Sequence, residues 1–165
     1  MKLLTHQFLS TQLESIESKI EPKHLPWTIP DYLTLYQQFE QLRTLILSRE
    51  IRVLITLPVL QELDLDKSRR EIREIIRFLH ERIDSNDPFV KLHEKIDEDD
   101  GSNDHFYNYR QQLKMTHLMI VKVIVSTETS NVKIVCSDYA SRDFLISENL
   151  DKDSIHVCTS GPDDM

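Results

Sequence analysis

Apolar residues along this chain alternate between two spacings, and the alternation predicts helices and strands in turn. Steps of three and four place Leu9, Leu13, Ile16 and Ile20 on one face of a helix over residues 3–20, and Pro22 ends the run. The same spacing predicts helices over about 33–47, 67–83, 107–125 and 139–149. Dense β-branched and aliphatic runs predict strands at 27–30, 51–57, 132–136 and 154–158.

This order of elements predicts an α/β fold, in which a parallel sheet carries helices on both faces. Residues 95–105 are almost wholly polar and are expected to form a flexible acidic loop. We expect residues 1–21 to be a leading helix packed on the domain, residues 22–160 to be the domain itself, and residues 161–165 to be a disordered tail.

Composition narrows the class of protein. With 165 residues, of which 39% are hydrophobic and 29% charged, the chain fits one soluble globular domain. No apolar run approaches the roughly 20 residues that span a bilayer, and the first residues turn polar at once, so we expect neither a membrane segment nor a signal peptide. Cys136 and Cys158 fall in predicted buried strands, which suggests reduced thiols in the cytoplasm or nucleus. Two glycines exclude a glycine-rich phosphate loop.

The formal net charge of −8 argues against a protein that coats nucleic acid, because such binding neutralises phosphates with basic side chains. The same charge is compatible with a nuclease that gathers carboxylates around metal ions.

Several acids follow the predicted strands. Asp31 comes directly after the first strand, Glu62 and Asp64 follow the second by a few residues, and Asp138 comes directly after the third. Ligands of parallel sheets bind beyond the carboxyl ends of the strands, where these acids can converge on Mg²⁺ or Mn²⁺. Asp31 and Asp138 also stand at predicted helix starts, where aspartate is a good N-cap, and both roles remain open.

Three segments resemble PIN domains. Residues 53–64 resemble the family's apolar strand and its Val-x-x-Glu-Leu-Asp turn, Pro30-Asp31 resembles its first acidic site, and residues 135–138 resemble its last one. The leading helix and the basic helix after Asp64 look most like the C-terminal PIN domains of the Smg/Est family, which act in nonsense-mediated mRNA decay. The resemblance implies a three-layer, parallel-sheet, PIN-like (Rossmann-like) fold. It also implies an acidic site of Asp31, Glu62 and Asp138, single-stranded RNA as substrate, and other mRNA-decay proteins as partners in the cytoplasm or nucleus.

The chain departs from that pattern at several positions. Tyr32 and Leu33 replace a small polar pair, and Thr56 stands where the family has proline. The stretch that opens the helix before the last core strand normally carries an acid, but here it holds Met115, Thr116 and His117. We therefore expect a degenerate, catalytically inactive domain without a cofactor, which binds or scaffolds in RNA surveillance. The alternative is an active endoribonuclease that uses Mg²⁺ or Mn²⁺. Asp104 would replace the missing acid if its loop folded back, and a third possibility is an α/β domain unrelated to RNA.

The helix over 67–83 carries Arg69, Arg73 and Arg77 to one side of its apolar face. They could form a ridge that follows RNA phosphates. The alternative is an ordinary solvated surface, in which arginines pair with glutamates four residues on, such as Arg70 with Glu74.

Overall fold

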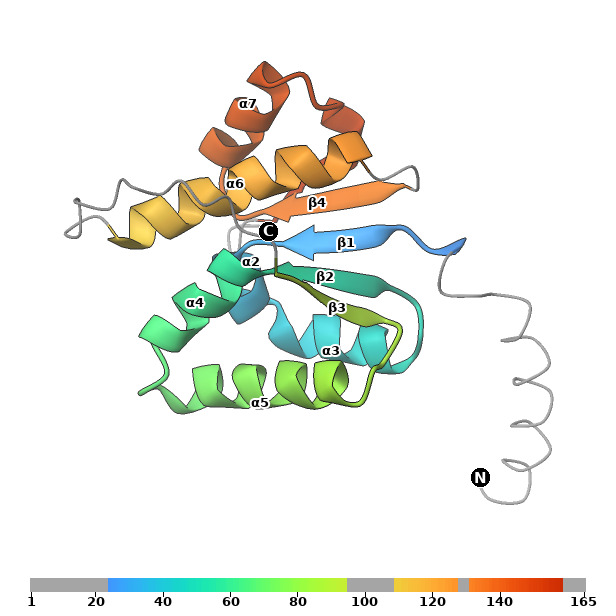
Figure 1. The fold of residues 1–165 in the computed structure, drawn as a ribbon, viewed down its shortest axis with the longest axis vertical. Helices are drawn as coiled ribbons and strands as arrows, with labels where there is room; N and C mark the ends of the chain where they lie inside the picture. The colour runs from blue at the N-terminus through green and yellow to red at the C-terminus, as the bar shows by residue number, and fades with distance from the viewer. Residues whose placement is uncertain (1–23, 95–108, 128–130, 159–165) are drawn as a thin grey trace.

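The computed structural model describes residues 24–94, 109–127 and 131–158, whose arrangement is shown in Figure 1. Their strands are β1 Trp27–Pro30, β2 Arg52–Thr56, β3 Val90–His93, β4 Val132–Cys136 and β5 Ile155–Val157. Their α-helices are α2 Tyr32–Gln37, α3 Phe39–Leu47, α4 Leu57–Leu65, α5 Arg70–Asp84, α6 Tyr109–Thr127 and α7 Tyr139–Ser147. A short 3₁₀ helix, η4 Lys152–Ser154, precedes β5.

The strands form one sheet in the order β3-β2-β1-β4-β5, and every neighbouring pair is parallel. β1 lies at the centre, with Thr28 paired to Val53 of β2 and Ile29 paired to Ile134 of β4. The chain winds outward from β1 to one edge and then returns to the other side of β1, so the strand order reverses between β1 and β4. That is the point at which open α/β sheets place their ligand sites.

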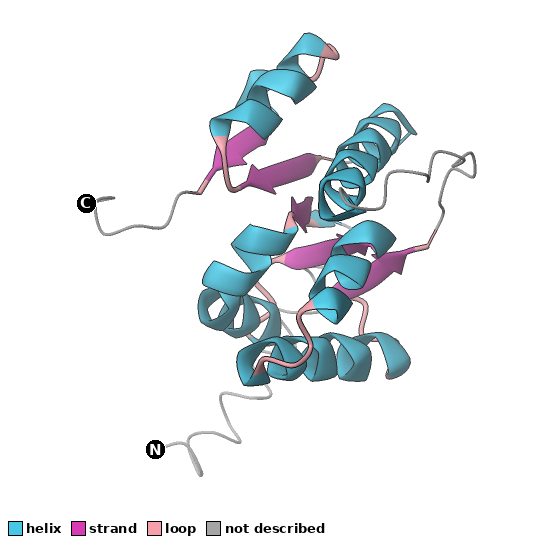
Figure 2. Cartoon of the chain, turned by 90° about the vertical axis from the view of Figure 1, so that its left-hand side faces the viewer, coloured by secondary structure: helices cyan, strands magenta, loops and turns pink. Residues whose placement is uncertain are grey.

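Helices cover both faces of the sheet, and each face has its own apolar cluster (Figures 1 and 2). Val53 and Ile55 of β2 pack with α2, α3, α4 and α5 on one face. Trp27 and Ile29 of β1 pack with α6 and α7 on the other. This arrangement confirms the expected three-layer α/β class with a parallel sheet.

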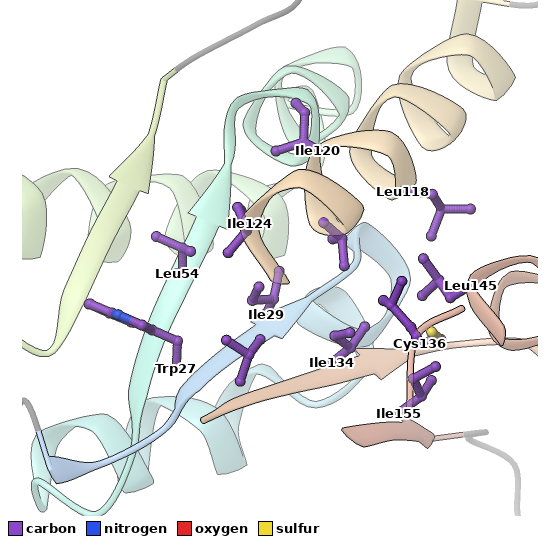
Figure 3. Packing of buried hydrophobic residues seen from close by; sticks show 13 residues of the cluster. Trp27, Ile29, Leu54, Leu118, Ile120, Ile124, Ile134, Cys136, Leu145 and Ile155 are labelled. Atoms are coloured by element: carbon purple, nitrogen blue, oxygen red, sulfur yellow. The ribbon is translucent and has the colours of Figure 1, made fainter. Parts of the chain in front are cut away.

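The apolar cluster beneath α6 explains why the sequences of the central strands are almost continuously apolar (Figure 3). Ile29 and Val121 have no measurable exposure, and Ile134 is 1% exposed. Side chains of this size contribute about 1.5–3 kcal/mol each when fully buried. Both faces of a parallel sheet are covered by helices, so its strands lack the alternation of apolar and polar residues found in half-exposed sheets.

The structure corrects two predictions of secondary structure, one of a helix and one of a turn. The helix expected over 33–47 breaks at Gln38, whose φ of −113° and ψ of 21° end α2 and precede α3. The apolar spacing continues across this break, so the sequence pattern did not reveal it. The turn expected after the second strand is instead the helix α4, which starts at Leu57 with Pro58 in its first turn, where proline is well tolerated.

The pattern of apolar residues does not predict the edge strand β3. It has only four residues, and its exposed Lys91 follows Val90 directly. The preceding turn is held by Asp87, whose carboxylate accepts from Arg49 over 2.8 Å and from the backbone N–H of Phe89 over 2.9 Å. A short strand of mixed polarity gives too weak a periodic signal to stand out beside such a turn.

The helix expected over 3–20, the acidic loop over 95–105 and the tail over 161–165 lie outside the described residues. Cys136 is buried in β4, Cys158 follows β5, and the two cysteines are not joined in a disulfide. Among the helices that the structure describes, none is long and apolar enough to cross a membrane.

Candidate functional site

A cavity of about 280 Å³ opens beyond the carboxyl ends of β1 and β4, at the point where the strand order reverses. Its walls come from α2, α4, α6 and the loop that enters α7. The lining residues are Asp31, Tyr32, Leu33, Val59, Glu62, Arg110, Gln111, Lys114, His117, Ser137 and Asp138. All three predicted acidic residues, Asp31, Glu62 and Asp138, thus line one cavity.

Asp31 is held in place by both of its carboxylate oxygens. One accepts from the backbone N–H of Thr34 over 2.9 Å, so Asp31 is the N-cap of α2. The other accepts from the backbone N–H of Ser137 over 2.9 Å and from its hydroxyl over 2.8 Å. The side chain therefore ties the end of β1 to the end of β4, and it is 7% exposed.

Asp138 caps α7 and forms an ion pair at the same time. Its carboxylate accepts from the backbone N–H of Ser141 over 2.7 Å and from Nζ of Lys114 over 2.7 Å. Burial pushes the pKa of Asp138 upward, but the bonds from Lys114 and Ser141 outweigh it, and the net pKa is lowered. Asp138 is thus an ionised carboxylate whose charge is matched by an amine of the same chain.

Glu62 lies on the inner side of α4, and its side chain is 10% exposed. Burial raises its pKa to about 7, and the guanidinium of Arg110, 3.6 Å away, opposes this shift. Glu62 therefore titrates near neutral pH. Asp64, two residues further on, is 63% exposed, pairs with Lys67 over 3.4 Å and does not line the cavity.

Arg110 anchors a cluster at the lip of the cavity that the sequence analysis missed. Two of its nitrogens donate to the two oxygens of Asp66, over 3.2 and 3.0 Å. Tyr32 also donates its hydroxyl to Asp66, and the guanidinium lies 5.7 Å from the centre of the Tyr32 ring. Hydrogen bonding from Tyr32 and Arg110 lowers the pKa of Asp66, and burial together with Asp66 raises that of Tyr32 to about 12.

One sequence signal could have pointed to the two basic residues of the cavity. Arg110 and Lys114 are four residues apart on a predicted helix, so they share a helix face. That helix, α6, leads into β4, which pairs with β1 in parallel. A helix that connects parallel strands begins at their carboxyl ends, so the first turns of α6 lie beside the cavity.

His117 and Thr116 turn in different directions from α6. His117 lines the cavity and is fully packed, with Nδ1 2.8 Å from the hydroxyl of Thr56 at the end of β2. Burial lowers its pKa to about 4, so the ring is neutral at physiological pH. Thr116 donates its hydroxyl to the carbonyl of Gln112 on its own helix, and Met115 is 36% exposed. Of Met115, Thr116 and His117, only His117 lines the cavity.

The donor set does not fit a divalent ion as it stands. No group of three or more histidine, cysteine, aspartate or glutamate side chains in the described residues is arranged to hold a metal. Asp31 has both oxygens engaged, Asp138 is paired with Lys114, and Glu62 faces Arg110. The ammonium of Lys114 and the guanidinium of Arg110 already supply these carboxylates with the positive charge that a metal ion would bring. Asp104, the proposed substitute acid, lies outside the described residues.

Two of the three ridge arginines are engaged locally. Arg69 precedes α5, donates to the hydroxyl of Tyr36 and lies 4.9 Å from the centre of that ring. Arg73 donates to the carbonyls of Lys67 and Ser68 over 3.1 and 2.9 Å, which ties down the turn before the helix. Arg77 is exposed. The expected surface pair of Arg70 with Glu74 is present at 3.7 Å.

No protein-family model matches the chain, and neither does any curated protein. Among solved structures, one similar chain is described as the PIN domain of human SMG5. It is 18% identical, the match covers 74% of this chain and 99% of that one, and the TM-score is 0.42.

Proposed function

We propose that this chain is a PIN-like domain that has lost metal-dependent cleavage of RNA and acts as a binding module. The PIN-like assignment is based on the resemblance of the chain's acidic segments to PIN domains. The position of the cavity supports it, because Asp31 and Asp138 follow β1 and β4 on the two sides of the reversal in strand order.

The main observation in favour of lost nuclease activity is the ion pair of Lys114 with Asp138. A nuclease of this kind needs carboxylates that are free to bind Mg²⁺ or Mn²⁺, which activate water and stabilise the charge on phosphate. Here the ammonium of Lys114 lies 2.7 Å from Asp138, and Arg110 lies 3.6 Å from Glu62. A metal would have to displace one cation or approach close to both, and repulsion between like charges weakens its binding.

The binding role is proposed for mRNA surveillance, in particular nonsense-mediated decay, in the cytoplasm or nucleus. The basis is the resemblance to the Smg/Est PIN domains, and the partners would be other mRNA-decay proteins. Single-stranded RNA is the second candidate partner, with Arg69, Arg73 and Arg77 as its contacts. The net charge of −8 and the local bonds of Arg69 and Arg73 weigh against RNA.

The direct test is an RNA cleavage assay. The purified chain is incubated with labelled single-stranded RNA and either Mg²⁺ or Mn²⁺, beside a buffer control and the Asp138→Asn variant. We expect no cleavage above buffer for either protein. RNA binding at two salt concentrations, with and without the triple change of Arg69, Arg73 and Arg77 to Glu, tests the ridge, and we expect no difference between the two proteins.

An active endoribonuclease is the second candidate, because three carboxylates do line one cavity at the expected place. It requires Lys114 to leave Asp138 when RNA or metal arrives. Metal-dependent cleavage that disappears in Asp138→Asn would establish this alternative and overturn the inactive assignment.

A further inference from the structure

The outer face of α6 carries an unusual stripe of exposed apolar side chains. Met115, Met119 and Val123 are spaced four residues apart and are 36%, 46% and 54% exposed. Successive steps of four form one row along a helix. The inner face of the same helix is already buried against the sheet through Val121 and Ile124, so this row is a second apolar face.

The stripe is also free of charge. The 19 residues of α6 include no acid. Each of its three basic residues reaches a carboxylate of a neighbouring element: Arg110 at Asp66, Lys114 at Asp138 and Lys122 at Glu148 over 2.6 Å. In a chain with 29% charged residues, such a face is suited to contact another apolar surface.

We propose that this stripe is the docking site for the chain's own N-terminal segment, residues 3–20. That segment has an apolar row of its own, Leu9, Leu13, Ile16 and Ile20, at helical spacing. Two helices with matching apolar rows pack side by side through their ridges and grooves. The inference does not depend on the nuclease proposal.

The place where the segment joins the fold fits this docking site. It leads into β1, and the backbone N–H of Trp27 donates to the carbonyl of Asn131, four residues beyond the end of α6. Ile124 of α6 and Trp27 of β1 belong to one apolar cluster (Figure 3), and Val123 is the residue before Ile124 in α6.

The lengths also agree. Residues 21–26 can span up to about 20 Å when extended, and 18 helical residues extend for about 27 Å. The stripe from Met115 to Val123 needs only about 12 Å of helix. A parallel arrangement, in which the segment runs in the same direction as α6, then brings Ile20 to Val123 and Ile16 to Met119.

Cross-linking in the full chain tests the placement. The background is Cys158→Ser, because Cys136 is buried. Ile16→Cys with Met119→Cys should be joined within one chain by a short bis-maleimide. Ile16→Cys with Leu47→Cys is the matched control, since Leu47 is 51% exposed but lies on α3, which covers the opposite face of the sheet. Linkage between two chains, or linkage no greater than that of the Leu47 control, would overturn the proposal.

A double-mutant cycle gives an independent readout. If Ile16 covers Met119, Met119→Ala should raise the unfolding equilibrium constant by about tenfold, and combining it with Ile16→Ala should raise it by clearly less than the product of the two single effects. If the two effects multiply, or if Met119→Ala changes the constant by less than about twofold, the stripe is not covered by this segment.

Discussion

The ammonium of Lys114 lies 2.7 Å from the carboxylate of Asp138, across the cavity at the carboxyl ends of β1 and β4. The lysine comes from α6 and the aspartate from the start of α7. The two side chains are 35% and 38% exposed, so the pair is partly shielded from water and remains accessible to ions. This relationship makes the acidic site testable, because one substitution removes the built-in cation without touching a carboxylate.

Lys114→Ala should increase the affinity of the chain for Mn²⁺ by about tenfold, because it removes one positive charge next to Asp138. The pKa of Asp138 should rise at the same time, since Lys114 is one of the groups that lower it. Calorimetry or the electron paramagnetic resonance of free Mn²⁺ measures the affinity. The control is Lys122→Ala, which removes an ion pair with Glu148 away from the cavity. Equal affinities in the two variants would contradict the role given to Lys114.

Lys114→Asp should bind Mn²⁺ more tightly than Lys114→Ala, whereas Thr116→Asp should bind it no better than the unaltered chain. Lys114 lines the cavity, but the hydroxyl of Thr116 is bonded to Gln112 on its own helix. An acid at position 116 therefore points elsewhere. The comparison uses the same Mn²⁺ titration. Higher Mn²⁺ affinity in Thr116→Asp alone would mean that position 116, and not position 114, faces the cavity.

Glu62→Gln should become progressively more stable than the unaltered chain as the pH rises from 5 to 8. The folded pKa of Glu62 is raised from 4.5 to about 7, so its neutral form is favoured in the folded state. Its stabilising effect is complete below the unfolded pKa and is lost as the pH rises through 7. The variant should gain about 2 kcal/mol over this range. Urea unfolding at pH 5, 6.5 and 8 measures the difference.

His117 changes the stability with pH in the opposite direction to Glu62, and its effect should be measurable in the Glu62→Gln variant. Its folded pKa is lowered from 6.5 to about 4, so its contribution is present above pH 6.5 and is lost as the pH falls toward 4. The variant should therefore lose stability below pH 6.5 more steeply than the unaltered chain. Glu74→Gln, which affects an exposed pair with Arg70, serves as the control and should show no such trend. A pH-independent difference for Glu62→Gln would contradict the buried-acid interpretation.

Tyr32→Phe should destabilise the fold by about 1–2 kcal/mol, because it removes the hydroxyl that donates to the carboxylate of Asp66. The pKa of Asp66 should also rise, since that bond is the largest cause of its lowering. Tyr36→Phe is the matched control on the same helix, since its hydroxyl accepts an exposed bond from Arg69 and should be worth about 0.5 kcal/mol or less. Chemical unfolding followed by circular dichroism measures both, and equal losses would show that the Asp66 cluster adds nothing specific.

Much of the fold could be predicted from periodicity. Buried runs such as 132–136 and helices such as 107–125 are long or apolar enough for their spacing to be decisive, and their order implies a parallel sheet. β3 could not be predicted because four residues of mixed polarity show no clear periodicity. The break at Gln38 escaped because the apolar row runs through it.

The candidate site divides in the same way. Asp31 and Asp138 could be found because an acid directly after a parallel strand must lie at the carboxyl edge of the sheet, where ligands of such sheets bind. Their spacing places Lys114 and Arg110 on one helix face, but their ion pairs could not be predicted, since the partners lie 24 and 44 residues away along the chain. Nothing in the local sequence indicates which carboxylate an exposed lysine or arginine will reach.

The sequence by itself determined the class of fold, the acids that follow the strands and the absence of a carboxylate at positions 115–117, because each of these depends on local spacing and on the identity of a few residues. The tertiary structure alone decided that His117 faces the cavity while Thr116 does not, that Glu62 is buried and that two cations stand among the acids. The physical reason is that pKa values and ion pairs depend on burial and on distances across the fold, which follow only from how α4, α6 and α7 pack around the ends of β1 and β4.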